Sequence, residues 1–146
     1  MIRYFDASAI VKRYVREAGS SLVRTLLTGA SPATSRLSEV EVASAVTRRW
    51  REGALSIAAR DRVLRAFATD LSAFHVIEVT DETAGLARAL LLRHSLRSGD
   101  SIQLASCLIL QQALRSPLPM VVFDGRLREA AAGEGVTVLP PASPSR

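Results

Sequence analysis

The sequence predicts an α/β fold: a three-layer α/β/α sandwich around a short, mostly parallel sheet of four or five strands. Short apolar runs, which are typical of buried strands, alternate along the chain with longer segments that carry apolar residues at helical spacing. A chain that passes from each strand to the next through helices builds a parallel sheet with helices on both faces. Because the strands of such a sheet run in one direction, with right-handed crossovers between them, every junction from a strand to a helix lies at one edge of the sheet.

Two strands and four helices are expected in the first half of the chain, and helical segments are identified by apolar residues three or four positions apart. Ser20 or Ser21 is expected to cap the second helix, which Gly29 ends. Ser38 and Glu41 have the spacing of a capping box at the start of the third helix. The second strand is expected because this helix start follows it directly. The elements are strands at 2–5 and 32–35 and helices at 6–14, 21–28, 38–52 and 57–71.

Three strands and three helices are expected in the second half. The run 74–79 alternates and is rich in β-branched residues, which indicates a strand. Thr80 starts the helix after it, and Asp100 opens another helix with a broad apolar surface. The last two strands are short apolar runs. The elements are strands at 74–79, 120–123 and 136–139 and helices at 80–94, 100–114 and 127–132.

The composition is that of one globular domain. Hydrophobic residues make up 48% of the chain and charged residues 23%, which excludes a disordered protein. We expect the domain to cover residues 1–139 and a flexible, proline-rich tail to cover 140–146. No apolar run approaches the length that spans a bilayer, and Arg3 and Asp6 interrupt the early apolar run that a signal peptide would need. Cys107 is the only cysteine, so no internal disulfide can form, and a cytoplasmic location is expected.

The charge of the chain favours an anionic partner. The net charge is +5, from 19 basic and 14 acidic residues, which suits a polyanion or an acidic protein. Only 5% of the residues are aromatic, so side chains on which bases could stack are scarce. A nucleic acid would therefore be contacted mainly through its phosphates.

Four carboxylates from separate parts of the chain are expected to meet at the carboxyl edge of the sheet, where α/β folds usually bind ligands. Asp6 and Asp124 directly follow the first and fourth strands. Glu41 lies in the first turn of the helix after the second strand. Asp100 begins a helix that leads back into the sheet, and a helix antiparallel to the strands begins at this same edge.

Each carboxylate also has a purely structural explanation. Asp6, Asp100 and Asp124 can be helix N-caps, and Glu41 can be the partner of Ser38 in the capping box. Four ionised carboxylates in one place, however, repel each other by a few kcal/mol per pair at separations of about 5 Å, and they require a counter-charge. Hard divalent cations prefer oxygen ligands, whereas the chain offers no His-rich or Cys-rich set for zinc. The pattern is typical of metal-assisted phosphodiester hydrolysis.

Four motifs around these carboxylates resemble those of PIN-domain proteins, in particular the VapC-type toxins of type II toxin–antitoxin systems. The resemblance extends over nearly the whole chain, with the motifs in the same order and at similar spacing. The motifs are Tyr4-Phe5-Asp6-Ala7-Ser8-Ala9-Ile10-Val11-Lys12, Ser38-Glu39-Val40-Glu41-Val42-Ala43-Ser44-Ala45, Leu96-Arg97-Ser98-Gly99-Asp100-Ser101-Ile102-Gln103-Leu104-Ala105 and Phe123-Asp124-Gly125-Arg126-Leu127.

The resemblance implies a PIN-like fold and a ribonuclease that depends on Mg²⁺ or Mn²⁺. Asp6, Glu41, Asp100 and Asp124 match the acidic positions that are catalytic and hold the metal in that family. The resemblance also selects Glu41 over Glu39, which spacing alone leaves open.

Two further positions bear on this site. Ser8 matches a small hydroxyl residue that supports the site in relatives, although it suits a helix start equally well. Relatives often carry Ser or Thr two residues before the last aspartate, and Val122 departs from that pattern. The role of Asp124 is therefore less strongly implied than those of the other three carboxylates.

The resemblance also implies partners. The substrate would be RNA, and a VapB-type antitoxin would place its C-terminal segment in a groove and block the site. The chain would form a homodimer, and a heterotetramer or larger assembly with the antitoxin. Lys12, Arg13 and Arg16 follow Asp6 on its helix and are candidates for contact with the substrate.

Two other functions are compatible with parts of the sequence. A phosphatase of the haloacid-dehalogenase kind also carries an aspartate after its first strand, but it requires a second aspartate two residues later, where Ser8 stands. A non-catalytic PIN-fold binding module would keep the fold and use its apolar helices to contact a partner.

Overall fold

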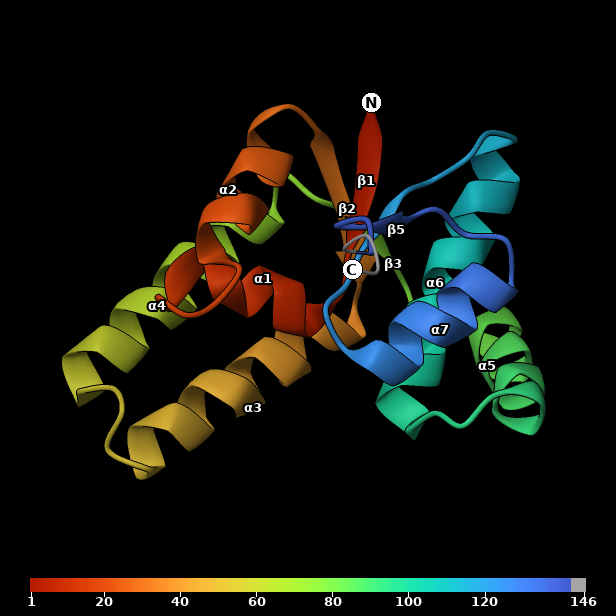
Figure 1. The fold of residues 1–146 in the computed structure, drawn as a ribbon. Helices are drawn as coiled ribbons and strands as arrows, with labels where there is room; N and C mark the ends of the chain where they lie inside the picture. Colours follow the sequence, from red (N-terminus) through yellow and green to blue (C-terminus); the bar gives the residue numbers. More distant parts are fainter. Residues whose placement is uncertain (143–146) are drawn as a thin grey trace.

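The computed structural model describes residues 1–142, which form seven helices and five strands (Figure 1). Residues 143–146, the end of the tail expected at 140–146, lie outside the described residues. Within the described part, no helix is both long enough and apolar enough to cross a bilayer. The strands are β1 (Ile2–Phe5), β2 (Ser31–Ser35), β3 (His75–Ile77), β4 (Met120–Val121) and β5 (Val138–Leu139). The helices are α1 (Ala7–Tyr14), α2 (Ser20–Thr28), α3 (Leu37–Arg51), α4 (Ile57–Leu71), α5 (Asp81–Arg93), α6 (Ser98–Leu114) and α7 (Gly125–Gly133).

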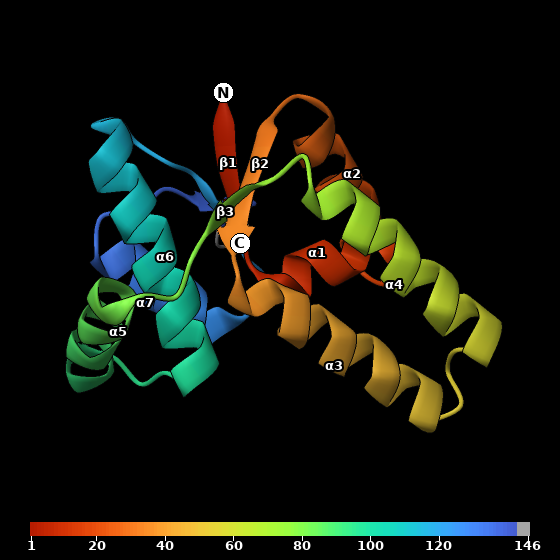
Figure 2. The ribbon, with the colours of Figure 1, turned by 180° about the vertical axis from the view of Figure 1, so that it is seen from behind.

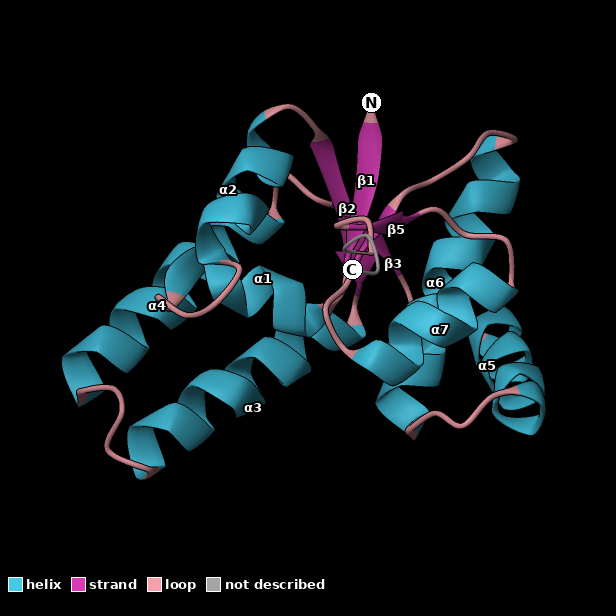
Figure 3. Ribbon diagram, in the orientation of Figure 1, coloured by secondary structure: helices cyan, strands magenta, loops and turns pink. Residues whose placement is uncertain are grey.

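The five strands form one parallel sheet in the order β3-β2-β1-β4-β5. The chain builds the sheet outward from β1 to β3 and then returns to place β4 on the other side of β1. Figure 3 shows how small this sheet is beside the helices that surround it. The reversal of direction makes the border between β1 and β4 a topological switch point, and ligands of open parallel sheets bind at the carboxyl ends of such strands.

The helices cover the two faces of the sheet as separate layers. Figures 1 and 2 show α1 to α4 on one side and α5 to α7 on the other. Right-handed crossovers require this division, because the chain moves across the sheet in one direction before β3 and in the opposite direction after it. The predicted three-layer sandwich with a five-stranded parallel sheet is therefore confirmed.

Alternating strand residues fill two cores, one on each face. Tyr4 is fully buried with Leu104 and other residues of the layer formed by α5 to α7. The next residue, Phe5, is fully buried among residues of α1, α3 and α4. In β4, Met120 and Val121 divide between the two cores in the same way. Since successive side chains of a strand point to opposite faces, the last residues of β1 lock both layers onto the sheet.

The start of α2 differs from the prediction. Neither Ser20 nor Ser21 caps this helix; its N-cap is Gly19, whose φ of 90° lies in the left-handed region that favours glycine. Ser20 lies inside the helix, where its hydroxyl accepts a hydrogen bond from the Glu17 N–H (2.9 Å) and donates one to the Val15 carbonyl (3.0 Å). The hydroxyl thus braces the preceding turn instead of capping the helix.

The starts of two later helices also differ. The helix predicted at 38–52 begins at Leu37 without a side-chain hydrogen bond at its N-cap, so Ser38 and Glu41 form no capping box. The helix predicted at 100–114 begins at Ser98, which places Asp100 within its first turn. Three predicted strands are shorter than expected because the parallel ladder is short: β4, for example, pairs only two residues with each neighbour.

Replacing a buried side chain at the sheet interface should destabilise the fold. We expect Leu104→Ala to lower the free energy of unfolding by about 2–5 kcal/mol, because Leu104 is fully buried and the change leaves a cavity. Leu92→Ala is the control, because Leu92 is 90% exposed and its loss should cost no more than about 0.5 kcal/mol. Denaturant unfolding measures both, and equal effects would contradict this description of the core.

Candidate active site

The four predicted carboxylates line a single cavity of about 670 Å³. Asp6 reaches it from the end of β1, and Glu41 from the first turns of α3. Asp100 reaches it from the first turn of α6, and Asp124 from the residue before α7. The cavity therefore lies at the carboxyl edge of the sheet, beside the switch point between β1 and β4. The remaining lining residues are Ala7, Ser8, Arg97, Ser98, Gly99, Gln103, Gly125 and Arg126.

Asp6 is both the N-cap of α1 and a member of the cavity. Its Oδ1 accepts a hydrogen bond from the Ala9 N–H (2.9 Å), and its Oδ2 accepts one from the Ser8 hydroxyl (2.9 Å). The side chain is only 4% exposed. Burial, and secondarily the charges of Asp100 and Glu41, raise the pKa of Asp6 to about 7 even though both hydrogen bonds lower it. Two hydrogen bonds thus fix the Asp6 carboxylate in a buried position that disfavours its ionised form.

Glu41 is held by a glutamine that the sequence did not single out. The Gln103 side-chain amide donates one hydrogen bond to Glu41 Oε1 (2.7 Å) and another to the Ser38 hydroxyl (3.0 Å). Its carbonyl oxygen accepts a hydrogen bond from the Tyr4 hydroxyl (2.6 Å). Gln103 is almost fully buried, so these bonds satisfy both ends of a side chain that water hardly reaches.

The hydrogen bonds around Gln103 have a single consistent direction. The Thr34 hydroxyl donates to the Phe5 carbonyl (2.7 Å), which leaves its oxygen to accept from Ser38 (2.6 Å). A reversed Gln103 amide would aim its carbonyl oxygen at the Glu41 carboxylate, which the like charge forbids. The network therefore joins the end of β1 to the Glu41 carboxylate through buried groups. Gln103 stands one helical turn after Asp100, a spacing from which its position could have been predicted.

Gly99 allows Glu41 to pack against the first turn of α6. A Cβ atom at this position would lie 2.9 Å from Glu41 Oε2, closer than such atoms approach each other in proteins. The N-terminus of α6 has no side-chain hydrogen bond from its N-cap, Arg97, and its helix dipole favours a negative charge nearby. Glu41 is therefore held by Gln103 on one oxygen and by close packing on the other.

Asp100 and Asp124 complete the cavity from its more open side. Asp100 is not an N-cap, since Arg97 holds that position. Burial, followed by the charges of Asp124 and Glu41, raises the pKa of Asp100 above its ordinary value. Asp124 is exposed and caps α7, with Oδ1 accepting a hydrogen bond from the Leu127 N–H (3.0 Å). Val122 is buried in the core and offers no polar side-chain group to this cavity.

The three basic residues predicted to contact substrate do not line this cavity. Lys12 lies with its Nζ 4.9 Å from the centre of the Phe123 ring and binds groups of the following loop. Arg13 forms an ion pair with Asp70 (3.4 Å) and lines a different cavity. Arg16 is exposed and lines neither. Lys12 lies six positions after Asp6, which carries it about 9 Å along the helix axis.

Two other basic residues do line the acidic cavity. Arg97 is the N-cap of α6, and Arg126 lies in the first turn of α7. Both are exposed. Arg97 is close enough to lower the pKa of Asp100 through its charge, partly offsetting the effect of the neighbouring carboxylates. The cationic groups at the cavity therefore come from residues at the N-termini of α6 and α7.

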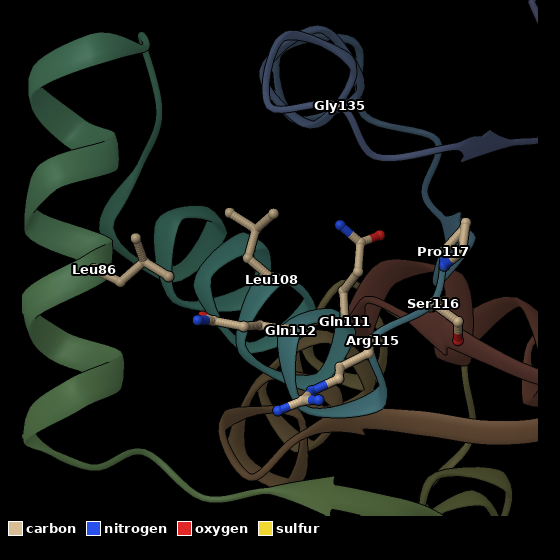
Figure 4. Close-up of a pocket in the computed structure, with 8 residues that line it drawn as sticks. All are labelled: Leu86, Leu108, Gln111, Gln112, Arg115, Ser116, Pro117 and Gly135. Atoms are coloured by element: carbon tan, nitrogen blue, oxygen red, sulfur yellow. The ribbon is translucent and has the colours of Figure 1, made fainter.

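A second cavity of about 620 Å³ lies at the opposite end of α6 (Figure 4). Because α6 begins at the carboxyl edge of the sheet, its last turn and the following loop lie at the amino edge. One of the two glutamines there, Gln111, already accepts a hydrogen bond from the Leu118 N–H (3.0 Å). No carboxylate lines this cavity, so it lacks the donors that the acidic cavity offers. It is lined by Leu86, Leu108, Gln111, Gln112, Arg115, Ser116, Pro117 and Gly135.

The donor chemistry of the acidic cavity fits a hard divalent cation. Asp6, Glu41, Asp100 and Asp124 present only oxygen ligands, as Mg²⁺ and Mn²⁺ prefer. Within residues 1–142, no group of three or more His, Cys, Asp or Glu side chains is already arranged around a common metal position. On the open side, the Asp100 side chain accepts no hydrogen bond from the described residues, whereas Asp124 is held through Oδ1 by its cap bond to α7. Metal binding stays a prediction for these four residues.

The chain is similar to known proteins over nearly its whole length. The sequence model of the PIN domain matches residues 3–133. Ribonuclease VapC45 and Ribonuclease VapC49, both from Mycobacterium tuberculosis, are each 35% identical to it over 139 residues, which cover 94% of either chain. A chain in the structure of a toxin-antitoxin complex from Klebsiella pneumoniae superposes with a TM-score of 0.65 at 18% identity, covering 96% of this chain and 98% of that chain. At this identity the structural likeness concerns the fold alone.

The contribution of Asp6 to the stability of the metal-free protein should fall as the pH rises from about 4 to about 7. Since the pKa of Asp6 is about 7 in the folded state and 3.8 ordinarily, the folded state retains a proton that the unfolded state has released in this range. Asp6→Asn removes this contribution while keeping an acceptor for the Ala9 N–H. Urea unfolding with a chelator at about pH 5 and about pH 8 measures the effect. A stability difference between wild type and variant that does not change with pH would contradict it.

Proposed function

The chain belongs to the PIN domain family, and we propose that it is a metal-dependent endoribonuclease toxin that hydrolyses phosphodiester bonds in RNA. The family assignment confirms the resemblance of the four sequence motifs. The observation that carries the proposed activity is the meeting of Asp6, Glu41, Asp100 and Asp124, from four separate elements, in one cavity. The names of the two curated relatives, which are ribonucleases, support RNA as the substrate.

We propose that Asp6, Glu41, Asp100 and Asp124 hold Mg²⁺ or Mn²⁺. When bound, such an ion would lower the pKa of a water molecule and neutralise negative charge on the phosphate. The raised pKa of Asp6 and of Asp100 supports this proposal, because it results first from burial and second from the charges of neighbouring carboxylates, and a bound cation would offset both effects.

The residues of the chain contribute by fixing the ligands in advance. The Ser8 hydroxyl and the Ala9 N–H hold the two oxygens of Asp6, so this side chain cannot turn away from the cavity. Gln103 holds one oxygen of Glu41. Ligands oriented by hydrogen bonds to neighbouring groups lose little conformational entropy when an ion or a substrate binds. Asp6 and Glu41 would therefore form the rigid part of the site. Asp124 would be held through one oxygen by its cap bond to Leu127, and Asp100 would be the adaptable ligand.

We propose a VapB-type antitoxin as the protein partner, and a homodimer that joins it in a heterotetramer or larger assembly. The VapC names of the curated relatives support this partner, as does the structure from Klebsiella pneumoniae, which is that of a toxin-antitoxin complex. The cytoplasm, where RNA is available, is the compartment that suits the proposed activity.

The two alternative functions receive less support. The family assignment gives no support to a haloacid-dehalogenase-like phosphatase, and the hydroxyl of Ser8 donates to Asp6 where that chemistry needs a second carboxylate. A non-catalytic PIN-fold module would have no use for carboxylates held at an energetic cost. An absence of RNA cleavage by the wild-type protein with either metal would favour this non-catalytic module.

Asp100→Asn should abolish RNA cleavage without unfolding the protein. We expect a loss of at least about a hundredfold in rate, because the change removes one negative donor from the proposed metal site. Asp81→Asn is the matched control: Asp81 is exposed and also lies in the first turn of a helix, but not in the cavity. Cleavage of an end-labelled single-stranded RNA, with Mg²⁺, with Mn²⁺ and with a chelator, measures the rates. A wild-type protein that cuts no RNA with either metal would refute the activity, and equal rates for all three proteins would refute the site.

Gln103→Leu should weaken metal binding in a protein that still folds. The change leaves Glu41 Oε1 without its hydrogen bond, and loss of such a supporting group typically costs about tenfold to a hundredfold in metal affinity. We also expect a loss of about 1–3 kcal/mol in the free energy of unfolding, because Tyr4 and Ser38 lose buried partners. Gln112→Leu, on the exposed surface at the other end of α6, is the control. Calorimetric titration with Mn²⁺ decides, and an unchanged dissociation constant for Gln103→Leu would contradict this role.

A further inference from the structure

Two arginines at the acidic cavity have no partner in the described protein. Neither Arg97 nor Arg126 forms an ion pair or a side-chain hydrogen bond to any group within residues 1–142. Both are exposed, although four carboxylates lie in the same cavity. Other basic side chains of this surface are paired, for example Lys12 with Glu17 and Arg93 with Glu134. The two guanidinium groups are therefore available to an anion from outside the chain.

Arg126 lies between the acidic cavity and a smaller neighbour. Arg126 lines both the acidic cavity and a smaller cavity of about 210 Å³, which is distinct from the one at the other end of α6. In the smaller cavity, the Glu134 carboxylate holds Arg93 (2.6 Å) and His94 (3.0 Å) in place. Arg126 is the cation there that remains without a partner in the described residues. The other lining residues are Ser95, Glu129 and Ala130.

The charges at the acidic cavity require cations if a nucleic acid is to bind. Four carboxylates would repel the phosphate groups of RNA. Two guanidinium groups balance half of that charge, and one divalent cation would balance the rest. A guanidinium group can also donate two parallel hydrogen bonds to the oxygens of one phosphate, which gives it a defined position along the strand.

We propose that an RNA strand runs from the acidic cavity across Arg126 into the smaller cavity, with Arg97 binding the phosphate to be cleaved and Arg126 the next phosphate along the strand. The inference rests on the proposed function, and it assigns the direction in which the substrate leaves the site. The smaller cavity then takes the nucleotide beyond the cleaved bond, beside His94 and Ser95.

The affinity for RNA and its dependence on salt test the two arginines. All proteins carry Asp100→Asn so that the RNA stays intact, and the probe is a fluorescently labelled single-stranded RNA of about twelve nucleotides. We expect Arg97→Ala combined with Arg126→Ala to weaken binding about tenfold. The slope of log affinity against log salt should fall by about 1.4, because each phosphate that an arginine no longer neutralises reduces it by about 0.7. Arg65→Ala, at an exposed position of α4, is the control and should change neither quantity.

Shortening the RNA tests the path of the strand. With a dinucleotide, which has one bridging phosphate, Arg97→Ala should still weaken binding, whereas Arg126→Ala should have no effect. A loss of affinity from Arg126→Ala that persists with the dinucleotide would overturn the path into the smaller cavity.

The outcomes separate this inference from the function beneath it. If the protein without these changes cuts no RNA, the proposed function fails. If it cuts RNA and the double arginine variant binds RNA as tightly as the control with the same salt slope, only the inference on Arg97 and Arg126 fails. A variant that loses affinity for an acidic antitoxin segment while it keeps its affinity for RNA would also overturn the inference, because the arginines would then serve the protein partner.

Discussion

The hydrogen bond between Gln103 and Glu41 joins the two helical layers at the point where the sheet ends. Glu41 belongs to α3, on one face of the sheet, and Gln103 belongs to α6, on the other. Along the length of β1, the sheet lies between the two helical layers and keeps them apart. Beyond the last residue of β1 no strand separates them, and the layers meet directly through polar groups. The acidic cavity is this meeting place, so its geometry depends on how both layers pack against one short strand.

The same junction explains why β1 serves both the core and the site. Its last two side chains are buried in opposite layers, yet each residue also supplies a polar group: the Tyr4 hydroxyl binds Gln103, and the Phe5 carbonyl accepts from Thr34. Asp6 follows at once. A displacement of this strand would therefore change the packing of both cores and the positions of the carboxylates in the cavity together. The structure couples an electrostatically costly cavity to a strand whose last two side chains are fully buried, so the packing of the cores holds groups that repel each other.

The sequence predicted the architecture and the meeting of the four carboxylates in one place, for identifiable reasons. Periodicity locates helices and strands, and the common direction of parallel strands then places every strand-to-helix junction at one edge. This argument brought Asp6, Glu41, Asp100 and Asp124 to the same place without any knowledge of their contacts. The structural alternatives proved compatible with a site for Asp6 and Asp124, which do cap helices, and were wrong for Asp100 and Glu41.

What the sequence could not show was which polar groups turn inward. Ser38 has the spacing of a capping box, but its hydroxyl forms hydrogen bonds with Thr34 and Gln103 instead. These two partners are preferred because they are buried together with Ser38. The basic residues were sought on the helix that follows Asp6. The arginines at the cavity instead precede or begin other helices, a relation that appears only once the chain is folded.

Gly99 has a consequence for how this protein can change over generations. Every substitution at this position adds an atom that meets the flexible end of Glu41, so the backbone can stay in place while the carboxylate must shift. Such variants would keep both buried cores and differ in the position of the Glu41 carboxylate. Selection against the proposed activity could therefore act through a single missense change at Gly99 that leaves the apolar packing unaltered.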